Sequence, residues 1–148
     1  MKSLQELSDR IEIQDLITDY SYAVDTHRWD DLDAIFTPDA SLDFTATGGE
    51  AGDLPTIKVW FDKVLNLFAG HQHLVATSKI AIDGDTATAR TLCHNPMWLA
   101  PAGEGGGGEP RVVFVGLWYH DTLVRTVDGW RISARHQEKG YLYGLPAR

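Results

Sequence analysis

The stretch HLVATSKIAIDGDTATARTLCHNPMWL, residues 73–99, decides the fold class of this chain. Apolar and polar residues alternate through it, as in half-buried strands, and Asp83-Gly84 between the two alternating runs is a strong hairpin turn. The alternation returns on both sides of a second turn, Asp128-Gly129. We therefore expect an antiparallel meander with strands at residues 74–82, 86–99, 111–125 and 130–137.

The residues that precede this stretch predict helices. Ser3 and Glu6 form a capping-box pair, which satisfies free amides at a helix start. Apolar residues recur at helical spacing from there to Val24, so the first helix should end near residues 25–27. Helices first and an antiparallel meander afterwards is the pattern of an α+β fold.

Two shorter helices and one short strand are expected between these two parts. A helix at residues 30–36 should stop at Pro38, and a strand should follow at residues 41–44. The third helix has Asp53 as its N-terminal cap and Gly70 as its C-terminal stop.

Composition narrows the class of protein. The 148 residues suffice for one domain, 1–148, with residues 101–110 as a glycine-rich loop and 140–148 as a C-terminal tail. The formal net charge of −8 argues against nucleic acid or an anionic membrane surface as a partner. No apolar run approaches the roughly 20 residues of a spanning helix, and the polar N-terminus is unlike a signal peptide. Cys93 is the only cysteine, so we expect a cytoplasmic protein without an internal disulfide.

Two residues suggest acid–base chemistry. Asp25 lies at the end of the first predicted helix, and His73 opens a predicted strand. A carboxylate bonded to one imidazole nitrogen fixes the tautomer and leaves the other nitrogen free as a proton acceptor. If the two side chains meet inside a cavity, we expect a small acid–base enzyme; if they do not, we expect a binding or structural domain. His71 is spaced two from His73, but no third ligand of clear spacing accompanies the pair, so we expect no metal site.

One face of the strand at residues 86–99 carries small and mildly polar side chains. A curled sheet with small residues on its concave side leaves room for a ligand. The alternative is that these residues lie beneath the helices and let them pack closely. The residues are Ala87, Ala89, Thr91, Cys93, Asn95 and Met97.

Six motifs follow one another along most of the chain. They are Ile13-Gln14-Asp15-Leu16 with Tyr20 and Asp25; Trp29-Asp30-Asp31-Leu32; residues 36–40; the His73 strand; Ile82-Asp83-Gly84-Asp85; and Asp128-Gly129-Trp130-Arg131-Ile132. Together they resemble the SnoaL-like branch of the nuclear-transport-factor-2-like superfamily. The resemblance implies a cone, in which a strongly curved antiparallel sheet is covered by three N-terminal helices over a pocket.

The combination of Asp25 with His73 resembles the lyase members of this superfamily: scytalone dehydratase, bile acid 7α-dehydratase and lindane dehydrochlorinase. In those families a histidine at the His73 position abstracts a proton, and an aspartate at the Asp25 position orients it. Tyr20 matches a site tyrosine of the bile acid enzyme, and Asn95 falls where that enzyme has an acid, which leaves hydrogen bonding as its role. Phe44 falls on the catalytic aspartate of the ketosteroid isomerases, which argues against their chemistry.

The resemblance implies a lyase without a cofactor, in which His73, Asp25 and Tyr20 act on a small, largely apolar or cyclic molecule. The alternatives are an enzyme like the polyketide cyclases or isomerases, and a non-catalytic ligand-binding or subunit domain. The residues expected to line the pocket and bind substrate are Phe44, Trp60, Asn95, Trp98, Phe114, Trp118 and His120.

The two faces of the strand at residues 111–125 are assigned by parity. Phe114, Trp118 and His120 share one face, for which the cavity is a candidate destination. The other face would then be the exposed side of the sheet. A large apolar face is seldom left in water, so we expect a homo-oligomer, a dimer or trimer, that buries it. This face carries Val113, Val115, Leu117 and Tyr119.

Overall fold

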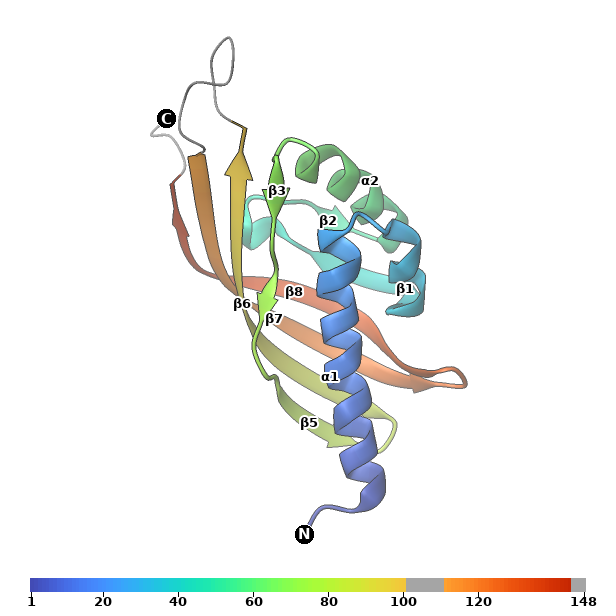
Figure 1. Cartoon of the computed structure of the whole chain (residues 1–148). Coiled ribbons are helices and arrows are strands. Elements are labelled where there is room, and N and C mark those ends of the chain that lie inside the picture. The colour runs from blue at the N-terminus through green and yellow to red at the C-terminus, as the bar shows by residue number, and fades with distance from the viewer. Residues whose placement is uncertain (101–110, 145–148) are drawn as a thin grey trace.

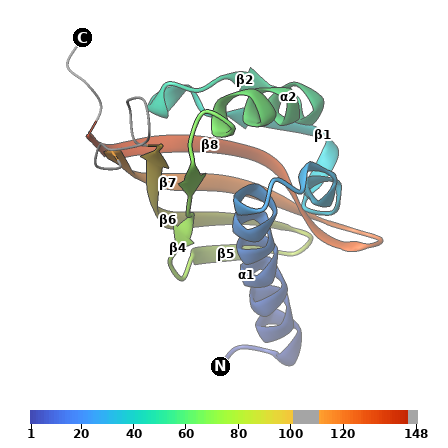
Figure 2. The ribbon, with the colours of Figure 1, turned by 45° about the horizontal axis from the view of Figure 1, so that its top comes forward.

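The computed structural model describes residues 1–100 and 111–144, so the predicted glycine-rich loop at residues 101–110 lies outside the described residues. Helices lie on one face of a curved, open sheet (Figure 1), and a turned view shows the same two layers (Figure 2). In chain order the elements are α1 (Leu4–Asp25), the 3-10 helix η1 (Trp29–Ala34), β1 (Phe36–Asp43), the 3-10 turn η2 (Thr45–Thr47), β2 (Ala51–Gly52), α2 (Leu54–Leu65), β3 (Gly70–His71), β4 (Leu74–Val75), β5 (Lys79–Asp83), β6 (Thr86–Leu99), β7 (Arg111–Thr126) and β8 (Gly129–Tyr143).

The sheet has eight strands in the order β2-β1-β8-β7-β6-β3, and β4 and β5 also pair with β6. β1 and β8 run parallel, whereas the other pairs recorded between the described strands are antiparallel. This architecture confirms the predicted α+β class with a curved sheet. The helices α1, η1 and α2 are the three that were expected before the meander.

Both α-helices begin as predicted, because at each start a side chain accepts a hydrogen bond from a backbone N–H that has no partner within the helix. Ser3 Oγ accepts the Glu6 N–H at 3.0 Å, and Asp53 Oδ1 accepts the Thr56 N–H at 2.9 Å. α1 ends at Asp25, as its apolar spacing predicts. The end of α1 therefore brings the Asp25 carboxylate to the backbone and ring of His73.

α2 ends at Leu65, before the predicted stop at Gly70. Gly70 instead belongs to β3 and pairs with Trp98 of β6. A Cβ atom at Gly70 would lie only 2.1 Å from the Trp98 indole. The close approach of strand and indole, and not a helix cap, is what requires glycine here.

The second predicted helix is a 3-10 helix, and β1 begins at Phe36, earlier than the expected strand. Pro38 therefore lies inside β1 and does not end a helix. The register of β1 against β8 shifts between Phe36 and Ser41. This irregularity accommodates a residue that has no N–H to donate to the ladder.

The strand predicted at residues 74–82 is divided into β4 and β5. The Ser78 N–H donates to Gln14 Oε1 at 3.0 Å, so a side chain of α1 takes the place of a strand partner at this break. At the other end of the sheet, β8 continues to Tyr143. The first residues of the segment expected as a tail, 140–148, are thus part of a strand, and residues 145–148 lie outside the described residues.

The parity prediction for β7 is wrong, because its two faces are exchanged. β6 places Cys93 opposite Leu117 and Asn95 opposite Val115, so these side chains share the concave face. The β7 residues on this face are between 0% and 5% exposed, and they lie inside the protomer. The homo-oligomer stays a prediction, but the surface it would bury is not this one. The inward-facing residues are Val113, Val115, Leu117 and Tyr119.

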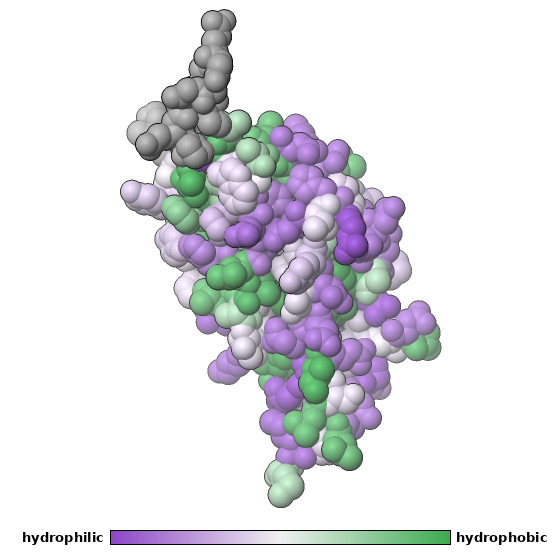
Figure 3. All heavy atoms as spheres, in the orientation of Figure 1, coloured by the Kyte–Doolittle hydropathy of each residue, from purple (hydrophilic) through white to green (hydrophobic). Residues whose placement is uncertain are grey.

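The small face of β6 serves both of the purposes that were considered. Ala87, Ala89 and Cys93 are buried in the hydrophobic core, whereas Asn95 and Met97 line a pocket. On the face with α1 toward the viewer, Figure 3 shows a largely hydrophilic surface with apolar groups in small, separate areas. Among the described residues no helix is long and apolar enough to cross a membrane.

Candidate functional site

A pocket of about 190 Å³ lies between α2, the loop after β1 and the concave face of β6, β7 and β8. Its wall is mostly aromatic and aliphatic, with a few polar side chains. This composition is typical of sites for small organic molecules. The aromatic lining residues are Tyr20, Phe44, Trp60, Phe61, Phe68 and Tyr119, and the polar ones are Thr47, His73, Asn95 and Gln137.

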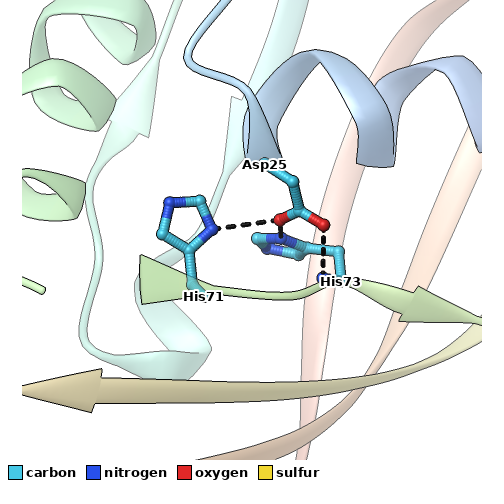
Figure 4. A group of neighbouring side chains, drawn as sticks. All are labelled: Asp25, His71 and His73. Carbon is cyan, nitrogen blue, oxygen red and sulfur yellow. Dashed lines mark hydrogen bonds and ion pairs between the residues drawn. The ribbon is translucent and has the colours of Figure 1, made fainter. Parts of the chain in front are cut away.

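The hydrogen bond predicted between His73 and Asp25 is present. His73 Nδ1 lies 2.7 Å from Asp25 Oδ1, and the His73 backbone N–H donates to Asp25 Oδ2 at 2.8 Å (Figure 4). The His73 side chain is only 7% exposed. Two contacts from one residue therefore fix the carboxylate against the imidazole at the pocket wall.

Asp25 is held as a carboxylate. Its partial burial alone would raise the pKa of the carboxyl group, but the hydrogen bonds from His71 and His73 outweigh burial and hold that pKa well below its usual range. An ionised carboxylate can only accept hydrogen bonds. The Nδ1 atom of His73 therefore carries the proton and donates a hydrogen bond to Asp25. The Nε2 atom of a neutral His73 then has a free lone pair.

The sequence interpretation missed His71. His71 Nδ1 lies 3.0 Å from the same Asp25 Oδ1 (Figure 4), and the His71 Nε2 atom lies 2.9 Å from His27 Nε2. Spacing along the chain gives no signal for these contacts, because Asp25 and His71 are 46 positions apart. The only signal was the two-residue spacing of His71 and His73, which places both in one short segment.

No third ligand of clear spacing accompanies His71 and His73 in the sequence, but the fold brings Asp25 close to both. Asp25, His71 and His73 each present one potential ligand atom, and these atoms lie within 4.8 Å of one another. These are the residues that could hold a metal ion. A tetrahedral zinc site with bonds of about 2.0–2.1 Å separates its ligand atoms by about 3.3 Å. The distances of 2.7 and 3.0 Å from Asp25 Oδ1 are shorter and are those of hydrogen bonds.

Asn95 completes the surroundings of the His73 ring. Its Nδ2 lies 3.1 Å from His73 Nε2, so the amide donates to the nitrogen that has the lone pair. Its Oδ1 is buried and has no hydrogen-bond partner among the described residues. A buried acceptor without a partner costs about 1–3 kcal/mol, which marks Asn95 as a residue that a ligand could satisfy.

Two tyrosines of the pocket wall, Tyr20 and Tyr119, pack against a buried arginine. The Arg135 guanidinium lies between the rings of Tyr20 and Tyr119, 4.1 and 4.2 Å from their centroids, and it pairs with Asp121 at 2.6 and 2.7 Å. Burial raises the pKa of the Tyr20 phenol to about 12, so the phenol stays protonated and can donate a hydrogen bond at neutral pH. The sequence interpretation included Tyr20 but placed Tyr119 on the wrong face of the sheet.

Of the seven residues expected to bind substrate, Phe44, Trp60 and Asn95 line the pocket. The other four are absent from its lining. Trp98 packs over Gly70, and the remaining three share the outer face of β7 as a result of the exchanged parity. Their contacts there are Phe114 stacked on His94, Trp118 beneath Arg90, and His120 hydrogen-bonded to Glu138.

A curved sheet that holds a hydrogen-bonded His–Asp pair in an apolar pocket defines a class of small, pocket-forming α+β proteins. The sequence profile of the SnoaL-like domain matches residues 5–136, and the chain therefore belongs to the SnoaL-like family. It is 48% identical over 139 residues to the uncharacterised proteins Rv2910c of Mycobacterium tuberculosis and Mb2934c of Mycobacterium bovis, a match that covers 94% of this chain and 90% of each relative.

Solved structures share the same fold. The Kfla4162 protein of Kribbella flavida superposes with a TM-score of 0.81 at 27% identity and covers 93% of this chain and 94% of that one. The LinA-type3 hexachlorocyclohexane dehydrochlorinase of Novosphingobium barchaimii gives 0.80 at 19% identity, with 97% and 94% covered. A nuclear transport factor 2-like protein of Salmonella enterica gives 0.72 at 18% identity, with 91% and 93% covered. At such low identities the last two matches show the fold alone.

Proposed function

We propose that this protein is a lyase that needs no cofactor and removes a proton and a leaving group from a small cyclic molecule. The observation that carries the proposal is the 2.7 Å contact between His73 Nδ1 and Asp25 Oδ1 at the wall of the pocket. With its Nδ1 proton directed to a carboxylate, the imidazole is oriented as a general base. A dehydrochlorinase among the fold neighbours is consistent with elimination from a ring.

In the proposed reaction a C–H bond of the substrate breaks, and its proton moves to His73 Nε2. The electron pair left on carbon forms the new double bond, and the leaving hydroxyl departs with its own bonding pair. The imidazolium then gives the proton to that hydroxyl, so that water leaves and His73 is neutral again. Asp25 stabilises the imidazolium while it exists and keeps the ring in place.

Asn95 and Tyr20 bind the substrate in this scheme. The Asn95 amide donates to His73 Nε2, so the substrate must displace this contact when its C–H group approaches. The unpaired Asn95 Oδ1 would accept a hydrogen bond from a substrate hydroxyl. The protonated Tyr20 phenol would donate to the oxygen on which charge develops.

The size of the pocket supports a small substrate. Its volume of about 190 Å³ is below the ~300–1,000 Å³ of sites for drug-sized ligands. A single ring or a compact pair of rings fits this volume better than a steroid does. The aromatic walls favour an apolar ring, and the few polar groups favour one or two hydroxyl substituents.

The test is a screen of cyclic alcohols and cyclic halides, with mass spectrometry to detect loss of water or hydrogen halide. His73→Ala should abolish turnover while the circular dichroism spectrum stays unchanged. His94→Ala is the matched control, since His94 lies on the outer face of β6 and contacts Phe114 and Tyr141. Wild-type turnover by His73→Ala would refute the lyase. A product that keeps every atom of the substrate would instead identify the cyclase or isomerase alternative.

A further inference from the structure

A second imidazole shares the Asp25 carboxylate with His73. The His71 side chain is 2% exposed, and its Nδ1 lies 3.0 Å from the Asp25 oxygen that His73 contacts at 2.7 Å. His71 does not line the substrate pocket. Its ring lies 5.8 Å from that of His73, edge to face, and the two side chains meet at the same Asp25 oxygen.

His27 holds the far side of the His71 ring. The two Nε2 atoms are 2.9 Å apart, and the rings are stacked with centroids 5.1 Å apart. His27 itself lies between His71 and Trp29, whose ring centroid is 5.0 Å away. His27 also has a φ of 55°, which is uncommon for any residue except glycine. Strained backbone of this kind is found where the surrounding structure fixes a side chain in one place.

The hydrogen bonds fix which nitrogen of each ring carries a proton. The ionised Asp25 only accepts, so His71 donates from Nδ1, as His73 does. The Nε2 atom of a neutral His71 must then accept, and the donor is the Nε2–H of His27. The two contacts thus form one chain of donors, which runs from His27 through His71 to Asp25.

This chain links two separate cavities. His73 lines the substrate pocket, whereas His27 lines a surface groove of about 370 Å³ formed with Trp29 and Asp30. Within residues 1–100 and 111–144 the two cavities have no lining residue in common. His71 is therefore held between Asp25 and a residue of a second groove that opens to solvent.

We propose that His71 is a positioning residue of the site, with its ring held by His27 and its Nδ1–H used to orient Asp25 and share its negative charge. This inference rests on the proposed lyase function, because it gives His71 a role in orienting the His73 base. Partners that orient a residue at the reaction centre commonly change activity by about 10–100-fold when they are removed.

Two substitutions at His71 distinguish the effect of losing the N–H donor from the effect of losing the imidazole ring. His71→Leu removes both nitrogens, whereas His71→Asn restores an amide N–H close to the place of Nδ1–H. We expect kcat to fall roughly tenfold in His71→Leu, with KM unchanged because His71 is outside the pocket, and to recover in His71→Asn. His94→Leu, on the outer face of β6, is the control for loss of a histidine.

A spectroscopic measurement needs no substrate. Proton–nitrogen correlation spectra of the histidine rings should show the Nδ1–H tautomer for both His71 and His73 in the full-length protein. In His71→Leu, Asp25 Oδ1 accepts from His73 alone, so the His73 Nδ1–H resonance should move downfield, and it should return in His71→Asn. His27→Asn tolerates the positive φ but is too short to reach His71, so the His71 Nε2 resonance should shift while Asp25 keeps the His71 proton on Nδ1.

The outcomes are distinct from those that test the lyase. An unchanged His73 resonance in His71→Leu, or an unchanged kcat, would overturn the role of His71. If His71→Leu fails to fold, His27→Asn decides: an unchanged His71 Nε2 resonance there would overturn the chain of donors. Failure of the lyase proposal would show elsewhere, as wild-type turnover by His73→Ala.

Discussion

The Arg125 guanidinium donates two hydrogen bonds to the Asp9 carboxylate, at 2.7 and 2.8 Å, and joins the start of α1 to the end of β7. Trp130 adds a third donor through its indole N–H at 3.2 Å. The Asp9 side chain is 4% exposed and that of Arg125 is 28% exposed. This pair fixes the long helix across the sheet, at the end of the molecule away from the pocket.

Acid should destabilise the protein partly through Asp9. The hydrogen bonds from Arg125 outweigh burial and hold the pKa of the Asp9 carboxyl well below its usual range. A depressed folded-state pKa stabilises the fold above the unfolded value of about 3.9, and this contribution is lost as the pH falls below about 5. Asp9→Asn should therefore lower the unfolding free energy at pH 7 and flatten its fall between pH 5 and pH 2.

The expected loss in Asp9→Asn is about 2 kcal/mol, less than the ~3–5 kcal/mol of a fully buried broken pair because Arg125 is partly exposed. Urea titrations at several pH values measure it. Asp85→Asn is the control, since Asp85 binds the same arginine but its side chain is 82% exposed. That change should cost less than ~1 kcal/mol. Equal losses of unfolding free energy in Asp9→Asn and Asp85→Asn would contradict the stabilising role given to the buried Asp9–Arg125 pair.

Asp25→Asn should separate the shape of the site from its charge. The amide has the size of the carboxylate, but it cannot compensate an imidazolium and can donate to the ring nitrogen in the wrong tautomer. We expect turnover to fall by about 10³–10⁴-fold, as in other dyads, with the fold retained. Steady-state rates beside a circular dichroism melt would check this, and a loss below tenfold would argue that Asp25 only supports the backbone of His73.

Gly70→Ala should be destabilising because of a single contact. The new methyl group would meet the Trp98 indole at 2.1 Å, and overpacking of this kind costs about 1–3 kcal/mol. In a Trp98→Ala background the same substitution should cost almost nothing, so a double-mutant cycle isolates the contact. Because Gly70 precedes His71, the single variant should also disturb the His71 contact with Asp25. Additive losses in the cycle would show that the strain lies elsewhere.

Trp60→Ala should enlarge the substrate pocket. Trp60 packs against Phe44 and Phe61, with ring centroids 5.7 and 5.3 Å away, and it forms part of the pocket wall. We expect the variant to accept bulkier rings, with the ratio of kcat/KM for a fused-ring over a single-ring substrate raised roughly tenfold. Val59→Ala, on the exposed side of α2, is the control. An unchanged ratio would place the substrate away from Trp60.

Local signals in the sequence account for most of the fold. The strands β6 and β7 have their predicted ends to within one residue, because alternation and the Asp-Gly turns act over short distances. The orientation of β7 could not be predicted, because both of its faces carry large apolar side chains and the connection from β6 does not fix the register. The break in the strand near Ser78 could not be predicted either, because it depends on a hydrogen bond to Gln14, which lies 64 positions away in the sequence.

The site was predictable where the family resemblance applied and not beyond it. His73 and Asp25 occupy positions that the resemblance identifies, and their contact was expected. His71 and His27 have no such counterpart, and their roles depend on ring stacking and on a strained backbone angle that appear only in three dimensions. The arginine between Tyr20 and Tyr119 could not be placed from the sequence, because a buried guanidinium needs a partner such as Asp121 that spacing does not show.

The parallel pairing of β1 with β8 has a consequence for synthesis of the protein. β8 is the last described strand to leave the ribosome, yet it lies between β1 and β7 within the sheet. Until it emerges, β1 has only the two-residue β2 as a strand partner, and the helices have only part of the surface that they cover. A nascent chain that has not yet released β8 therefore has an incomplete sheet, and its aromatic interior is accessible to chaperones and proteases until β8 inserts.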